Sequence, residues 1–300
     1  MIIQFKNCSV GAFFYWIIRN YHDYITAYKP PQPLFISAES LKKSTFRSFE
    51  EVFRKISFCR FWQFQGFFCT FAPNSKRITM KKFAVILAGC GRKDGSEINE
   101  AITLLLSLEQ HQCEYQCFAP NRPQTEVVDH LTDQKVDEKR NILTEAARLA
   151  RSNVKPVEEY KAADFDGLLF SGGYGVAKNL CDYAYKGADM EVQPDVARAI
   201  VETREAGKPL GGMCIAPVMF AKLLPGVCVT LGNEGTPDAD NVRAMGAYHV
   251  QTEHGDVCAD NELLVFTTPA YMLDATLKDV YDGAYNLIDA IVDTLDGKRD

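Results

Sequence analysis

The stretch Gly211-Gly212-Met213-Cys214-Ile215-Ala216-Pro217 decides the fold that this sequence predicts. Before it, residues 195–206 carry apolar side chains at helical spacing, and Pro209 prevents that helix from continuing. Residues 208–213 then have the pattern of a short buried strand, and the apolar run 215–224 starts another helix. A cysteine between a strand and a helix, with small residues two positions away on either side, is typical of a nucleophile elbow.

Cys214 has two interpretations on this evidence. At the N-terminus of the following helix, the helix dipole favours the thiolate over the thiol, which makes Cys214 a candidate nucleophile. Free cysteine is also among the most buried residue types, so a structural role is equally open. The remainder of the chain decides between the two.

The composition is that of a soluble globular protein, with 47% hydrophobic and 24% charged residues in a chain of 300. The ten cysteines show neither zinc-ligand spacing nor a disulfide framework. We therefore expect no metal and a reducing, cytoplasmic setting. The net charge of −6 is uneven, because the first 79 residues are basic and the rest are acidic. An acidic body argues against nucleic acid as a partner.

Residues 1–79 differ from the rest of the chain. The apolar run 10–18 is shorter than the roughly 20 residues that span a bilayer, so no membrane partner is expected. Met80, by contrast, stands directly before an excellent first strand. We therefore expect residues 1–79 to be an extension upstream of the functional start and residues 80–297 to be the functional domain. The alternative is a targeting segment, since residues 46–56 suit a basic amphipathic helix, and the location would then be mitochondrial.

Strands and helices alternate along the rest of the sequence, which predicts an open, mostly parallel α/β sheet. Residues 83–88 form the first expected strand, followed by a glycine-rich turn and a helix with its N-cap at Ser96. The apolar face of that helix is expected to carry Ile98, Ala101, Ile102, Leu105 and Leu108. The last helix covers residues 277–295. The other expected strands are residues 115–119, 166–170, 226–231, 248–250 and 263–267.

The turns 89–97, 171–175 and 213–216 fall at the carboxyl ends of strands, where such sheets bind ligands. The backbone N–H groups of Gly172 and Gly173, with that of Ile215, can form an oxyanion hole, although Gly-Gly after a strand is also a common turn.

Two side chains are candidate proton carriers beside Cys214. Glu97 is the first acid of a helix at the same sheet edge, where it can reach the sulfur or merely complement the helix dipole. His249 is the candidate for an accessory base, and a structural histidine is the alternative. The glycines of the first turn also hint at a nucleotide site, but no acid ends the second strand, so no cofactor is expected.

Four motifs together resemble one family: 87–97 (LAGCGRKDGSE), 171–180 (SGGYGVAKNL), 212–217 (GMCIAP) and 267–273 (TTPAYML). They resemble the ElbB family, called isoprenoid biosynthesis glyoxalase or enhancing-lycopene-biosynthesis protein, in the PfpI-like branch of the class I glutamine amidotransferase-like superfamily. The resemblance covers about residues 80–297. It implies a single flavodoxin-like three-layer sandwich and a homodimer. It also implies Cys214 as nucleophile, Glu97 as its carboxyl partner, and Gly173 and Ile215 as oxyanion-hole amides.

Two departures from the superfamily bear on the reaction. The histidine that follows the strand after the elbow is missing around residues 232–234, and no His-x-Glu pair occurs near the C-terminus. Protease and glutaminase activities are therefore not expected. The family resemblance instead implies a glutathione-independent glyoxalase, a lyase that converts methylglyoxal or glyoxal to a 2-hydroxy acid through a hemithioacetal on Cys214. The alternative is a non-enzymatic redox sensor or small-molecule-binding protein that uses the same cysteine.

Overall fold

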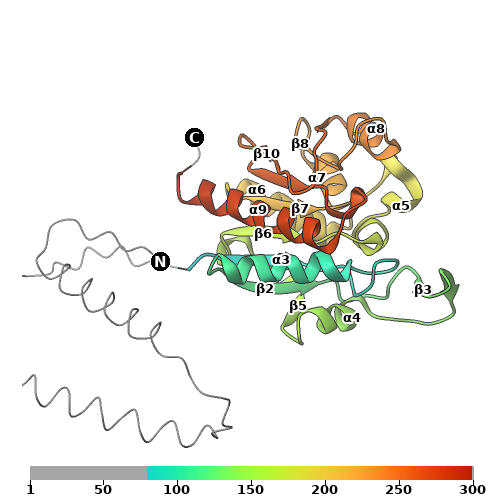
Figure 1. Cartoon of the computed structure of the whole chain (residues 1–300). Coiled ribbons are helices and arrows are strands. Elements are labelled where there is room, and N and C mark those ends of the chain that lie inside the picture. Colours follow the sequence, from blue (N-terminus) through green and yellow to red (C-terminus); the bar gives the residue numbers. More distant parts are fainter. Residues whose placement is uncertain (1–79, 299–300) are drawn as a thin grey trace, which may run out of the picture. The chain divides into compact units, whose positions relative to one another are not determined.

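A computed structural model describes residues 80–298 of the chain (Figure 1). The predictions for residues 1–79 lie outside the described residues. In the described part, the chain alternates between strands and helices as expected from its sequence.

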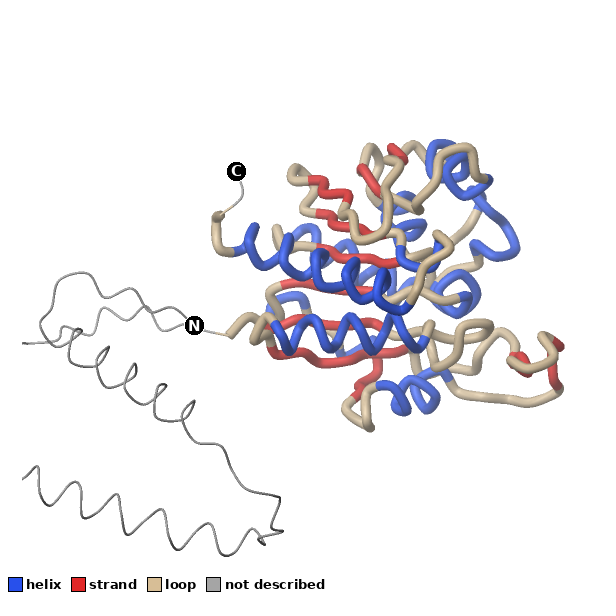
Figure 2. The backbone as a smooth tube through the Cα atoms, viewed as in Figure 1, coloured by secondary structure: helices blue, strands red, loops and turns tan. Residues whose placement is uncertain are grey.

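A seven-stranded sheet in the order β10-β11-β7-β6-β1-β2-β5 forms the centre of this region (Figure 2). Every neighbouring pair is parallel except β10 with β11, so the prediction of a mostly parallel sheet is confirmed. The strands are β1 (Lys82–Ile86), β2 (Glu114–Ala119), β5 (Val154–Pro156), β6 (Gly167–Phe170), β7 (Leu210–Met213), β10 (Cys258–Asp260) and β11 (Val265–Thr268).

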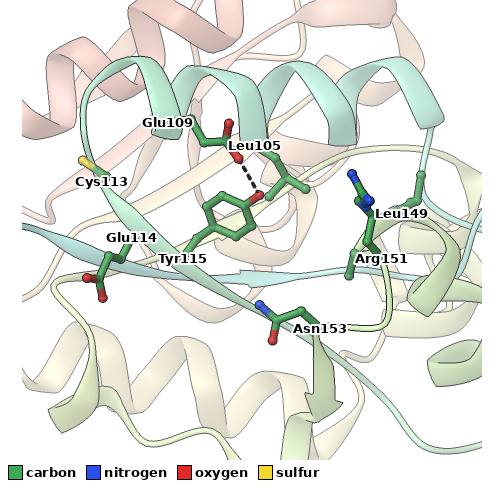
Figure 3. A pocket seen from close by; sticks show the side chains of 9 residues that line it. Leu105, Glu109, Cys113, Glu114, Tyr115, Leu149, Arg151 and Asn153 are labelled. Carbon is green, nitrogen blue, oxygen red and sulfur yellow. Dashed lines mark hydrogen bonds between the residues drawn. The ribbon is translucent and has the colours of Figure 1, made fainter. Parts of the chain in front are cut away.

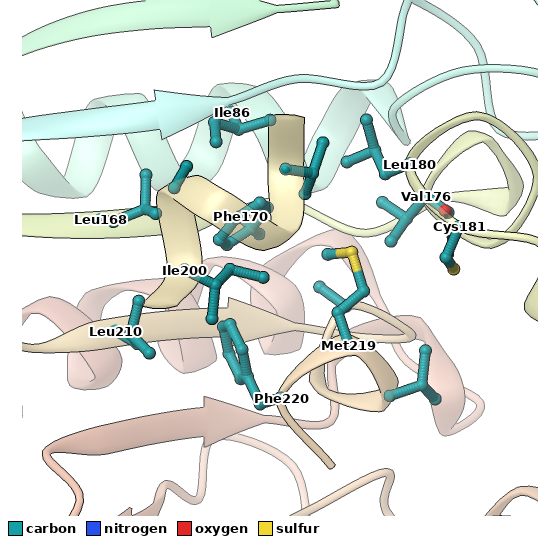
Figure 4. Close-up of a cluster of buried hydrophobic side chains, with 14 of the residues drawn as sticks. Ile86, Leu168, Phe170, Val176, Leu180, Cys181, Ile200, Leu210, Met219 and Phe220 are labelled. Atoms are coloured by element: carbon teal, nitrogen blue, oxygen red, sulfur yellow. Dashed lines mark hydrogen bonds between the residues drawn. The ribbon is translucent and has the colours of Figure 1, made fainter. Parts of the chain in front are cut away.

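Helices cover both faces of the sheet, which gives three layers. The side chains of β1 alternate: Phe83 and Val85 pack in one core cluster, and Ala84 and Ile86 pack in the other. The first cluster includes side chains of α3 (Ile98–Gln110), α4 (Ile142–Leu149) and α9 (Leu277–Leu295). The second, shown in Figure 4, includes side chains of α6 (Pro194–Glu205) and α7 (Pro217–Leu223). Because both strand faces are buried, apolar residues follow one another without alternation in sequence.

Shorter elements complete the described region. Residues 176–180 form a π-helical turn after β6, and two short helices follow at Tyr183–Lys186 (α5) and Pro237–Ala244 (α8). β3 (Val127–Asp129) and β4 (Gln134–Val136) form a separate hairpin. Among the described residues, no helix combines the length and the apolar character needed to span a membrane.

Two expected strands do not join the central sheet. The expected strands at residues 226–231 and 248–250 are the short β8 (Cys228–Val229) and β9 (Tyr248–His249), which pair with each other instead. The backbone N–H of Thr230 donates to the side-chain hydroxyl of Thr267 on β11 at 2.9 Å. This segment therefore contacts a side chain of β11 and not, as a paired strand would, its backbone carbonyl. The sheet edge beyond β11 is occupied by β10, which has only three residues and therefore gives little alternation to detect in sequence.

Candidate active site

Cys214 lies in the tight turn between β7 and α7, and its backbone adopts the left-handed region with φ of 57°. Its N–H donates to the carbonyl oxygen of Thr268 at 3.0 Å, which ties the turn to the end of β11. Glycines make room for it: a Cβ on Gly212 would lie 2.7 Å from the ring of Phe220, and one on Gly172 would lie 2.4 Å from the Cβ of Cys214. This close-packed turn, with a non-glycine residue at positive φ, has the geometry of the nucleophile elbow predicted from sequence.

The carboxyl group that contacts Cys214 belongs to Glu100, in the first turn of α3. Its side chain is fully buried and forms a hydrogen bond with the thiol of Cys214. The Oε2 atom of Glu100 also accepts from the N–H of Gly172 at 2.9 Å, and Oε1 accepts from the N–H of Tyr271 at 3.4 Å. Residues from three separate segments of the chain therefore converge on one carboxyl group.

The pKa of Glu100 is raised to about 7, mainly by burial and also by the negative charge of Glu97. The hydrogen bonds from Cys214, Tyr271 and Gly172 act in the opposite direction, because they favour the ionised carboxylate. A carboxyl group that exchanges its proton near neutral pH is suited to general acid–base chemistry.

The expectation that Glu97 itself meets the sulfur is corrected by this geometry. Glu97 is the N-cap of α3: its Oε2 accepts from the N–H of Glu100 at 2.8 Å, as a capping side chain does. Its own N–H donates to the carbonyl of Gly172 at 2.9 Å. The expected N-cap, Ser96, lies one residue earlier, and its hydroxyl accepts from the N–H of Ala88 at 2.9 Å. Glu97 thus acts on the thiol only through Glu100.

Glu100 lies outside the apolar face that the sequence predicts for this helix. Three members of that face, Ala101, Leu105 and Leu108, are buried, but Ile98 and Ile102 are each 45% exposed. The buried face is rotated toward Glu100 and includes the polar residues Thr103 and Ser107. Apolar spacing alone does not report a buried face that carries polar side chains.

The thiol of Cys214 is nearly buried, and burial raises its pKa well above the ordinary value. The negative charge of Glu100 and its hydrogen bond raise the pKa further, while hydrogen bonds from the N–H groups of Gly173 and Ile215 lower it. The thiolate favoured by a helix dipole stays a prediction. Burial acts against it here, and α7 starts only at Pro217. Both predicted oxyanion-hole amides do lie at the sulfur.

His249, the candidate accessory base, has both of its ring nitrogens in contact with other groups. The Nε2 atom of His249 accepts from the backbone N–H of Leu231 at 3.1 Å, and its Nδ1 atom lies 3.0 Å from Oε1 of Glu234. Both nitrogens are thus engaged in fixing the segment after β8. These contacts match the structural interpretation of this histidine and not that of an accessory base.

Figure 3 shows a separate hollow at the amino end of β2, where the hydroxyl of Tyr115 donates to Glu109 at 3.0 Å. The strand β2 begins at Glu114 here, whereas β7, which runs in the same direction, ends next to Cys214. The hollow therefore lies at the sheet edge opposite to the candidate site. No group of three or more histidine, cysteine or acidic residues suited to a metal ion occurs among residues 80–298.

Comparisons with known proteins point to one group. No family model matches the chain. The chain is 40% identical over 228 residues to the human glutamine amidotransferase-like class 1 domain-containing protein 3, mitochondrial, covering 72% of this chain and 84% of that protein. It is 30% identical over 223 residues to the ES1 protein, mitochondrial, of Danio rerio, covering 68% and 83%. A crystal structure of an isoprenoid biosynthesis protein with an amidotransferase-like domain from Ehrlichia chaffeensis is 39% identical, with a TM-score of 0.67, covering 72% of this chain and 99% of that one.

Substitutions at the two glutamates test which one serves Cys214. We expect the rate of alkylation of Cys214 by iodoacetamide to rise as Glu100 loses its proton near pH 7, because the carboxylate can then accept the thiol proton. Glu100→Gln removes this step. Glu97→Gln keeps it and moves it to lower pH, because a neighbouring negative charge is gone. The measurement is peptide mass spectrometry of Cys214 across pH; a step lost in Glu97→Gln but kept in Glu100→Gln would return the partner role to Glu97.

The buried acid also makes folding stability depend on pH. The pKa of Glu100 rises from an ordinary value of 4.5 to about 7 in the folded protein, so between these values the folded state binds more protons than the unfolded state. The free energy of unfolding contributed by this group is complete below pH 4.5 and is lost as the pH rises through 7. We expect Glu100→Gln to reduce the difference between the urea midpoints measured at pH 5 and pH 8. An equal difference in both proteins would contradict the raised pKa.

Proposed function

Since the chain belongs to the ElbB family of isoprenoid biosynthesis proteins with an amidotransferase-like domain, we propose that it is a glutathione-independent glyoxalase. Its substrates are 2-oxoaldehydes such as methylglyoxal or glyoxal, and its products are 2-hydroxy acids. The observation that carries the proposal is the buried hydrogen bond between Glu100 and Cys214, next to two backbone amides directed at the sulfur. We also extend to this chain the connection with isoprenoid biosynthesis that the name of the Ehrlichia protein states.

In the first step, the sulfur of Cys214 attacks the aldehyde carbon while the carboxylate of Glu100 accepts the thiol proton. A carbon–sulfur bond forms, and the carbonyl double bond becomes a single bond to a negatively charged oxygen. The N–H groups of Gly173 and Ile215 are placed to stabilise that oxygen, as in an oxyanion hole. The oxygen then takes the proton back from Glu100, which gives a hemithioacetal and restores the carboxylate.

In the second step, Glu100 moves a proton between adjacent carbons. The carboxylate takes the proton of C1 and returns it to the C2 oxygen, which forms an enediol. The carboxylate then takes the proton of the C1 hydroxyl and delivers it to C2, which leaves a thioester of the 2-hydroxy acid. Water cleaves the thioester and restores the thiol of Cys214. C1 is oxidised by two electrons and C2 is reduced by two, so the net change is the addition of one water and no external oxidant takes part.

The burial of Cys214 favours this reaction over the alternative of a redox sensor. Oxidation of cysteine follows thiolate character and solvent exposure. Cys214 is only 8% exposed, and its pKa is raised by burial and by Glu100. The raised pKa leaves little thiolate to react with peroxide, whereas Glu100 beside the thiol supplies the base that addition to an aldehyde needs.

Turnover of methylglyoxal without glutathione tests the proposal. We expect Cys214→Ser to abolish lactate formation, because the carboxylate of Glu100 is too weak a base to activate a hydroxyl. Glu100→Gln should lower the turnover by about 10²–10⁴-fold, the usual loss of a general acid–base group. Glu97→Gln, which keeps the capping oxygen, serves as the matched control and should retain most activity.

Two outcomes of this assay count against the proposal, the first against the glyoxalase activity and the second against the role of Glu100. The first is a folded wild-type protein that produces no lactate although Cys214 is alkylated normally, which would leave the sensor or binding protein as the function. The second is equal turnover in the wild type and Glu100→Gln, which would remove Glu100 from the proton path.

We further propose a mitochondrial location, the alternative to the cytoplasmic expectation. The names of the human, rat and Danio rerio relatives describe mitochondrial proteins. The basic residues 1–79 would then serve as the targeting segment. We expect the full chain with a C-terminal fluorescent tag to enter mitochondria, and a version that starts at Met80 to stay in the cytosol. Cytosolic signal from both proteins would support the cytoplasmic expectation instead.

A further inference from the structure

The turn that follows β11 supplies one of the hydrogen bonds to Glu100. β11 lies beside β7, with Thr268 opposite Met213, so the elbow and this turn leave neighbouring strands at the same sheet edge. Residues 270–272 form a single 3₁₀ turn. The N–H of Tyr271, in the middle of this turn, donates to Oε1 of Glu100 at 3.4 Å. The position of the turn therefore determines whether this N–H reaches the carboxyl group.

The backbone of the turn is strained at Ala270, whose φ is 45°. A non-glycine residue in this region costs on the order of 1–3 kcal/mol and persists where its surroundings hold it. One restraint is the hydrogen bond from Cys214 to the carbonyl of Thr268, just before the turn. The other comes from α3: Nδ2 of Asn99 donates to the hydroxyl oxygen of Tyr271 at 2.9 Å, across 172 positions of sequence.

We propose that Asn99 and Tyr271 are positioning residues for Glu100, and that their side-chain hydrogen bond holds the strained turn so that the N–H of Tyr271 stays on the carboxylate. Asn99 directly precedes Glu100 on α3, so one end of the helix carries both the acid and the group that fixes its partner turn. This inference deepens the proposed function, because Glu100 is the proton carrier there. The positioning role does not depend on whether methylglyoxal is the substrate.

The hydrogen bond from the turn stabilises the ionised form of Glu100. A donor on a carboxyl oxygen favours the ionised form, and two or three backbone N–H groups lower a carboxyl pKa by roughly 2 units, or about 0.7–1 unit each. The N–H of Tyr271 acts in this direction on Glu100. A turn that moves away leaves Glu100 more often protonated at neutral pH, and so less often able to accept the thiol proton.

The test uses the full chain and reads the pH dependence of Cys214 alkylation by iodoacetamide. Tyr271→Phe removes only the hydroxyl, and Asn99→Ala removes the donor. We expect either change to move the rise in alkylation rate to higher pH by about 0.5–1 unit, which is a roughly 3- to 10-fold lower rate on the acid side. The double variant should shift no further than either single variant, because both break the same bond.

Tyr281→Phe is the matched control, because the hydroxyl of Tyr281 donates to Oε1 of Gln110 at 2.7 Å, near the other end of α3. This variant also loses a tyrosine hydrogen bond to α3, but at the end of the helix away from Glu100. The pH profile of Cys214 alkylation should therefore stay that of the wild type. A profile unchanged in both Tyr271→Phe and Asn99→Ala would overturn the inference, even if both variants unfold at a lower temperature. An equal shift in Tyr281→Phe would overturn it as well. If the profile shifts as expected but no lactate forms, the positioning role stands and the glyoxalase proposal fails.

Discussion

The hydrogen bond between Glu100 and Cys214 is the interaction on which the site depends. A buried carboxyl group without partners is strongly unfavourable, so the surrounding chain must supply hydrogen bonds to keep Glu100 inside. The backbone of Gly172 and that of Tyr271 provide them, and both belong to turns at the carboxyl ends of parallel strands. The parallel sheet thus places four chain segments, including the elbow and the first turn of α3, around one acid.

Glu97 and Glu100, at the start of α3, differ in where their side chains point. Glu97 accepts from the backbone of its own helix and adds a negative charge at the helix N-terminus, where the dipole favours it. That charge then acts on Glu100, which is buried and has its pKa raised to about 7. Two acids three positions apart therefore lie in different environments, and the proposed function assigns the proton-carrying role to the buried one.

The sequence could predict the parts of the site that depend on local pattern. The elbow at Cys214 and the two amides of Gly173 and Ile215 are determined by small residues at strand ends, which are visible in sequence. The role of Glu100 does not follow from the apolar pattern, because the buried face of α3 is rotated away from Ile98 and Ile102 toward polar residues. The contact from Tyr271 joins positions 171 residues apart, and no local pattern reports such a contact. The edge strands β5 and β10 are not predictable for a different reason: each has only three residues, which is too short to show a periodic pattern.

The protonation of the pair explains which chemistry suits the site. Amide hydrolysis needs a base that then protonates a departing amine, a role usually given to histidine, and the ring nitrogens of His249 are engaged by Leu231 and Glu234. A shift of a proton between adjacent carbons expels no group, and one carboxyl near its pKa can both take and return the proton. Burial raises the pKa of both Glu100 and Cys214, so the loss of the Glu100 proton creates the base that the thiol needs. Chemistry at the sulfur therefore begins when the carboxylate of Glu100 is present to accept its proton.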